Sequence, residues 1–134
     1  MLNPFPSLLV YAFFAPAILR LGVAVMFFYL SWFHFKHRAD VGAELAPILS
    51  HGVVKIILPL YILLEILVGL GLFLGFWTQI AALIGLIICL KILIVRRSLR
   101  GLGPLSHATY ALVALICFSL LFLGAGAYAF DLPL

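Results

Sequence analysis

The chain has 134 residues, of which 67% are hydrophobic and 9% charged, and its mean hydropathy is +1.36. Soluble domains are about half apolar and about a quarter charged. A soluble globule of this size could not cover so much apolar surface with eight basic and four acidic side chains. Disorder is excluded as well, since disordered chains are poor in apolar residues. The composition indicates an integral membrane protein with a single domain, residues 1–134.

Four apolar runs have the length of a membrane-spanning helix, which needs about 20 residues. The link between the second and third runs is only a few residues long, so these two helices must form an antiparallel hairpin. The sequence therefore predicts an all-α fold, a membrane four-helix antiparallel bundle embedded in the lipid bilayer. The predicted helices span about 16–35, 53–76, 78–95 and 106–124.

The basic residues follow the pattern of membrane topology rather than that of a nucleic-acid-binding surface. Only Arg20 lies toward the side of the bundle that holds the two termini. The positive-inside rule then places the first and third loops in the cytoplasm and both termini outside, in the cytoplasmic (inner) membrane of the cell. The seven cations on the loop side are Lys36, Arg38, Lys55, Lys91, Arg96, Arg97 and Arg100.

Glu65 lies near the middle of the second predicted helix, where an unpaired carboxylate costs several kcal/mol. Counted at 1.5 Å per residue from a shared outer surface, Arg20 lies about 6 Å deep and Glu65 about 14 Å deep. We expect the two side chains to pair inside the bundle, because a guanidinium reaches far. The pair would either lock two helices together or handle protons at a cofactor-binding site. Alternatively, Arg20 extends outward alone and Glu65 is a neutral acid bonded to a hydroxyl.

The four histidines all fall near the basic surface of the predicted bundle. His34 and His37 share a helix face, while His51 and His107 lie at the starts of the second and fourth helices. Haem ligands in membrane bundles normally sit within the spans. We therefore interpret these histidines as interfacial residues and predict no metal site. Lys91 is expected to reach up to the same surface.

Small side chains point to close helix packing rather than to chemistry. Gly71 and Gly75 stand in GxxxG spacing, and Gly85 is a candidate for the hairpin contact. Cys89 and Cys117 lie in separate apolar runs without a metal-binding motif, so we interpret them as buried core residues.

Three segments together resemble the DoxX-like family of four-helix membrane proteins. LRLG at 19–22 resembles its first-helix arginine motif, and Lys36 resembles the lysine that ends that helix. LEILVGLGLFLGFWT at 64–78 is similar to its second helix and turn, and GAGAYAFD at 124–131 to its closing motif. The resemblance spans about residues 17–131. The chain departs from the family at Gln79 and Ala127, where arginine is common.

The resemblance implies roles linked to membrane redox systems, because the family's namesake resembles a subunit of a thiosulfate:quinone oxidoreductase. We expect an accessory subunit of a quinone-linked redox complex that binds another membrane protein, with Glu65 and Arg20 as candidate cofactor-binding residues. We expect the chain to carry no cofactor of its own, and a quinone is the one exception that this interpretation allows. The alternative is a scaffold or assembly factor that packs against another membrane protein, since related four-helix proteins act in this way. A small transporter is a third, weaker alternative, because four helices leave little room for alternating access.

Overall fold

A computed structural model describes residues 14–46, 49–95 and 103–124, together with 126 and 129. Within these residues the fold is entirely helical. Five helices follow one another along the chain: α1 (Phe14–Lys36), α2 (Arg38–Leu45), α3 (His51–Leu74), α4 (Thr78–Val95) and α5 (His107–Leu123).

The four predicted spans correspond to α1, α3, α4 and α5. Three of them, α1, α3 and α4, are long and apolar enough to cross a membrane. The fourth, α5, is apolar but has 17 residues. At 1.5 Å per residue it is about 26 Å long, which approaches the thickness of the hydrocarbon core, about 30 Å. The prediction of an all-α helical membrane bundle is confirmed.

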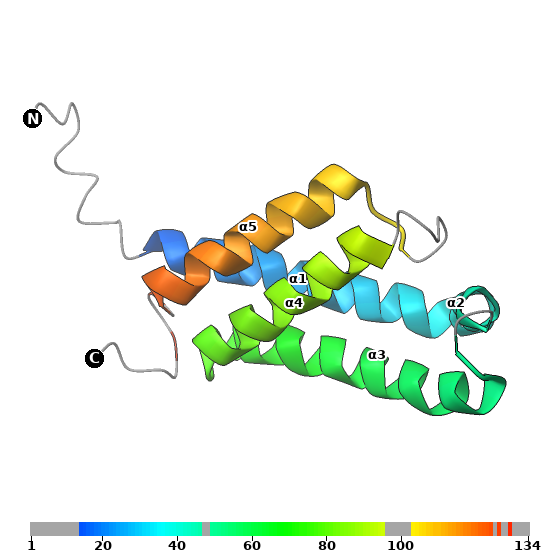
Figure 1. Cartoon of the computed structure of the whole chain (residues 1–134). Coiled ribbons are helices and arrows are strands. Elements are labelled where there is room, and N and C mark those ends of the chain that lie inside the picture. The colour runs from blue at the N-terminus through cyan, green and yellow to red at the C-terminus, as the bar shows by residue number, and fades with distance from the viewer. Residues whose placement is uncertain (1–13, 47–48, 96–102, 125, 127–128, 130–134) are drawn as a thin grey trace, which may run out of the picture.

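The four long helices run alternately up and down, as Figure 1 shows. The closest helix pairs are α1 with α3 and α4 with α5. The start of α1 and the end of α5 lie at one end of the bundle, and α2 lies at the other (Figure 1). The two pairs are joined by the short hairpin between α3 and α4, as the sequence predicted.

The hairpin turns through two residues in the left-handed region. Gly75 ends α3 with a φ of 68°, and Trp77 follows with a φ of 49°. Gly75 accepts this conformation because it has no Cβ. The rings of Phe76 and Trp77 stack with centroids 5.4 Å apart and an angle of 9° between their planes. Both side chains are exposed, so the hairpin presents an aromatic pair at its tip.

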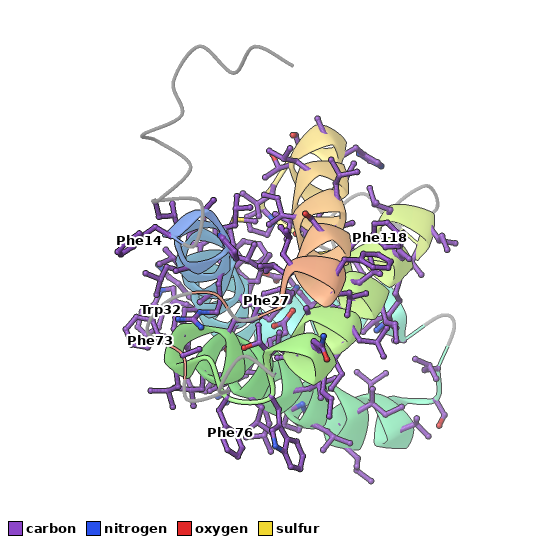
Figure 2. The ribbon with its side chains drawn as sticks, turned by 90° about the vertical axis from the view of Figure 1, so that its left-hand side faces the viewer. Phe14, Phe27, Trp32, Phe73, Phe76 and Phe118 are labelled. Carbon is purple, nitrogen blue, oxygen red and sulfur yellow. The ribbon has the colours of Figure 1, made fainter. Side chains whose placement is uncertain are left out.

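The bundle core is filled by apolar side chains from all four long helices. Phe27 is fully buried among them, whereas Phe14, Trp32, Phe73, Phe76 and Phe118 point away from the bundle (Figure 2). Large apolar side chains on the outside of a membrane bundle face lipid tails, which are as apolar as the core. The outer surface of the bundle is therefore apolar, as expected for the integral membrane protein that the composition indicates.

Two glycines show how closely the helices approach. A Cβ on Gly85 would lie 3.1 Å from the Phe27 ring and 3.3 Å from the Cys117 sulfur. Gly85 therefore lets α1 and α5 pack closely against α4. Its predicted role in the contact between α3 and α4 is wrong. That contact uses Gly71, where a Cβ would lie 3.2 Å from the Ala81 Cβ. Cys89 and Cys117 are buried and unbridged, as predicted.

The long polar segment after α1 contains a helix that the apolar runs of the sequence do not predict. This helix, α2, packs through Val41 against Leu58 and Ile62 of α3. Val41 is the one buried residue of α2. Its eight residues therefore lack the repeated apolar positions from which a helix is predicted. Because α2 follows the end of α1, the first turns of α3 extend past the end of α1 along the bundle axis (Figure 1).

Candidate buried acid–base site

Glu65 is fully buried, and its partner is a histidine. The Nδ1 atom of His34 on α1 lies 2.8 Å from Oε2 of Glu65 on α3, which is a short hydrogen bond. The exposed fractions of the two side chains are 2% and 0%. The pair thus joins two helices at the level where the sequence predicted a buried carboxylate paired with Arg20.

Two further side chains surround this pair. The ring of Tyr61, one turn before Glu65 on α3, packs edge-on against the His34 ring with centroids 5.7 Å apart. Lys91 reaches across from α4 and places Nζ 4.1 Å from the centre of the Tyr61 ring. This is the distance of a cation–π contact. Lys91 is itself exposed, so its ammonium covers the Tyr61 ring from the outside of the bundle.

The expected contact between Arg20 and Glu65 is wrong. Arg20 is buried, and its guanidinium lies against Gly75 at the end of α3. Gly75 is ten residues from Glu65, or about 15 Å along the helix. Arg20 therefore contributes to the end of the bundle that holds the α3–α4 hairpin, and His34 takes the role that was predicted for it.

The interfacial interpretation fails for His34 and needs refinement for His37. His34 points into the bundle, because it follows Phe27 and Leu30 on the buried face of α1. The ring of His37 stacks on Phe33 with centroids 4.4 Å apart, and its Nδ1 lies 3.2 Å from the Phe33 carbonyl oxygen. His107 is exposed at the start of α5. The side chain of His51 lies outside the described residues.

A small apolar slot opens on the lipid-facing side of the same helix turns. It has a volume of about 240 Å³ and lies between α1 and α3. Its walls come from residues that flank the acid–base pair in sequence: Ser31 and Phe35 flank His34, and Ile62 and Ile66 flank Glu65. Phe28 and Trp32 complete it, so the slot is largely aromatic with one hydroxyl. Trp32 points outward at the side of the bundle (Figure 2).

The pair can share one proton without changing its net charge, and it gains one negative charge when it gives that proton to a ligand. With one shared proton, it is either a charged histidine beside a carboxylate or two neutral groups. Both forms satisfy the buried atoms at the 2.8 Å contact. Neither the other carboxylate oxygen, Oε1, nor the Tyr61 hydroxyl makes a hydrogen bond of good geometry to a described residue. The two side chains are nevertheless close enough to interact with each other, so Tyr61 belongs to the same polar cluster as the pair.

Among the described residues, no group of three or more His, Cys, Asp or Glu side chains is placed to hold a metal ion. The pair has only two such members, and Cys89 and Cys117 belong to the core between α4 and α5. The chemistry that the described site offers is proton exchange and hydrogen bonding.

The fold and the site define a polytopic helical membrane protein that carries a buried acid–base pair between α1 and α3. The sequence model of the DoxX family matches residues 15–98, from the start of α1 to just beyond α4. The chain therefore belongs to the DoxX family, as the resemblance indicated. Comparison with curated proteins and with solved structures gives no match.

One of the two departures from the family pattern falls in the described part of the chain. Gln79, where arginine is common, donates from its side-chain amide to the Leu121 carbonyl oxygen of α5 at 3.2 Å. It ties the start of α4 to the last turn of α5. Ala127 lies outside the described residues.

Proposed function

We propose that this chain is an accessory subunit of a quinone-linked redox complex in the cytoplasmic membrane, and that the His34–Glu65 pair exchanges protons with the quinone. The observation that carries the proposal is the buried pair itself, 2.8 Å between Nδ1 and Oε2. Intramembrane ionisable groups are costly, and they mark proton relays and ligand sites in membrane proteins. Membership of the DoxX family supports the redox assignment, because the family's namesake resembles a subunit of a quinone-reducing enzyme.

The aromatic slot between α1 and α3 is the place proposed for the quinone ring. Phe28 and Trp32 offer flat apolar contacts, and the Ser31 hydroxyl offers one polar contact. The isoprenoid tail would remain among the lipids, because the slot lies on the outer face of the bundle. Reduction of a quinone to a quinol takes two electrons and two protons. The partner complex would supply the electrons. The pair does not itself line the slot, so it would pass on the protons one at a time through an intervening hydroxyl or water.

The experiment is a quinone titration of the purified full chain. We expect decylubiquinone to bind, and we expect Trp32→Leu to weaken binding by about tenfold, since stacking on one aromatic ring contributes roughly 1–1.5 kcal/mol. Trp77→Leu is the matched control, because Trp77 is similarly exposed, 61% against 67% for Trp32, but lies at the hairpin. Equal effects of the two substitutions would contradict the slot.

The alternative of a scaffold or assembly factor depends on glycine and aromatic surfaces that bind another protein. Gly69, Gly71 and Gly85 are occupied by packing inside the chain, which removes them as docking surfaces. The alternative then depends on the exposed aromatic side chains. A colourless, quinone-free preparation that co-purifies with a stoichiometric membrane partner would favour it over the redox proposal.

The proposed orientation has the α2 end of the bundle in the cytoplasm and both termini outside. Seven of the eight basic residues belong to the sequence segments in or beside the first and third loops, which favours the cytoplasm for that end. Cysteines introduced at Leu2 and Ser98 test the orientation with a membrane-impermeant thiol reagent in intact cells. We expect labelling at position 2 and protection at position 98. Labelling at both positions from the same side would overturn the arrangement.

A further inference from the structure

A second cavity, separate from the acid–base pair, lies between α2 and the first half of α3. It is an open groove of about 650 Å³, within the range of about 300–1,000 Å³ that is typical of sites for small molecules. Its walls are apolar: Ala39 and Ala43 of α2 face Leu58 and Ile62 of α3. The groove exists because α3 extends past the end of α1 and α2 covers only part of the extension.

The charged side chains that line this groove are both basic. Arg38 begins α2, and its guanidinium lies 5.7 Å from the centre of the Phe35 ring. Lys55 lies one turn after the start of α3. The acidic residues of α2, Asp40 and Glu44, do not line the groove. An apolar cavity with two cations and no anion complements a molecule with an anionic head and an apolar tail.

Pro59 adds a polar feature to the same wall. It lies inside α3 and lines the groove. Because proline has no N–H, the Lys55 carbonyl lacks its usual donor four residues further on. The helix that forms this wall thus leaves one carbonyl without its usual backbone donor, which suits a headgroup that carries both a phosphate and hydroxyls.

We infer that the groove between α2 and α3 binds an anionic glycerophospholipid of the phosphatidylglycerol type. The phosphate lies between Arg38 and Lys55, a headgroup hydroxyl donates to the Lys55 carbonyl, and one acyl chain runs past Leu58 and Ile62 toward Ile66. A zwitterionic lipid fits less well, because its ammonium group would add a third cation to the site. The groove shares Phe35, Ile62 and Ile66 with the aromatic slot, but Arg38 and Lys55 do not line the slot, so the headgroup contacts do not depend on the proposed quinone chemistry.

The test uses the purified full chain in a neutral detergent, with native mass spectrometry to measure the binding of dioleoylphosphatidylglycerol and dioleoylphosphatidylcholine. We expect the anionic lipid to bind more tightly to the wild type. Arg38→Gln and Lys55→Gln should each weaken its binding by about fivefold, and together by about twenty-fivefold, because a cation near the headgroup contributes roughly that factor. Lys36→Gln is the matched control: it removes an exposed cation at the same end of the bundle but does not line the groove.

A second variant keeps both cations and fills the cavity instead. Ala43 is exposed and lines the groove, so Ala43→Trp should block the acyl chain and lower binding without disturbing the core. The inference is overturned by equal binding of the two lipids to the wild type, by a loss with Lys36→Gln as large as that with Lys55→Gln, or by unchanged binding in Ala43→Trp.

Discussion

The α1–α3 pair and the α4–α5 pair have similar apolar sequences but different interiors. Three buried residues are basic or acidic, and all of them come from α1 and α3: Arg20, His34 and Glu65. The α4–α5 pair contributes Ala82, Cys89, Cys117 and other small or apolar side chains that pack closely. The α1–α3 pair therefore holds the buried arginine and the acid–base pair, whereas the α4–α5 pair forms a closely packed, mainly apolar wall that also contains the buried Thr78 and Tyr110. The cost of burying groups that can carry a charge is therefore largest in the α1–α3 pair.

The largest effect is expected at the acid–base pair. His34→Leu and Glu65→Leu should each destabilise the protein by about 3–5 kcal/mol, because each strands a buried polar partner. The double variant should recover a large part of the loss. Unfolding of the four proteins in mixed detergent micelles gives the coupling energy.

A second cycle, with Arg20→Leu and Glu65→Leu, serves as the control for the first. Its two effects should add, since Arg20 lies at the other end of the interface. Additive losses in the His34–Glu65 cycle would contradict the contact on which the difference between the two helix pairs depends.

The next largest effect tests the dense packing of the α4–α5 pair. Gly85→Val should destabilise the protein by about 1–3 kcal/mol, because its side chain would press on Phe27 and Cys117. Gly22 on α1 has nothing within 4 Å of a Cβ position, so Gly22→Val should leave the stability nearly unchanged. Thermal melts of both variants, followed by helical circular dichroism, compare the two sites directly.

A smaller effect distinguishes the first turns of α3 and α5. Ser106 caps α5, and its Oγ accepts a hydrogen bond from the Thr109 N–H at 3.2 Å. Ser106→Ala should therefore cost about 1 kcal/mol of stability. Ser50 stands at the same position before α3 but its side chain makes no capping bond. Ser50→Ala is the control, and a loss as large as that of Ser106→Ala would show that capping is not the cause.

The smallest effect is expected from metal removal. We predict that His34, His37, His51 and His107 hold no metal or haem, so a chelator should leave the melting temperature unchanged. Elemental analysis of the purified protein measures this directly. One equivalent of iron, copper or zinc that is lost on His34→Ala would refute the prediction and change the role assigned to the polar helix pair.

Hydropathy alone was enough to predict the four long helices, because each one must satisfy its backbone polar groups within the membrane. The third predicted helix, 78–95, has the observed bounds of α4, and the others differ by one or two residues at each end. Glu65 was also recognisable, because a carboxylate in the middle of an apolar run needs a partner. The helix bounds and the need of Glu65 for a partner could be predicted because they depend only on the local sequence and on the apolar bilayer.

The partner of Glu65 depends on how far the helices slide past one another, which local sequence does not record. Arg20 and His34 are fourteen residues apart, close to four full turns, so both lie on the face of α1 that meets α3. The predicted pairing with Arg20 requires the start of α1 and the end of α3 to lie at the same level in the membrane. In the structure Glu65 lies about 21 Å from the start of α3 while His34 lies about 3 Å from the end of α1. The stagger that brings them together follows from α2, which the hydropathy pattern did not reveal.

The stacked Phe76 and Trp77 rings at the hairpin have a consequence for how deep the bundle sits. Aromatic side chains prefer the headgroup level, and lysine and arginine prefer the aqueous boundary. The hairpin carries the first kind of anchor, while the α2 end carries the second. When the bilayer thickens or thins, a bundle held at both ends adjusts by tilting rather than by rising or sinking. Tilting scales the depths of Glu65 below the two surfaces by the same factor, so its fractional position between the hairpin end and the α2 end would stay nearly constant across membranes of different lipid composition.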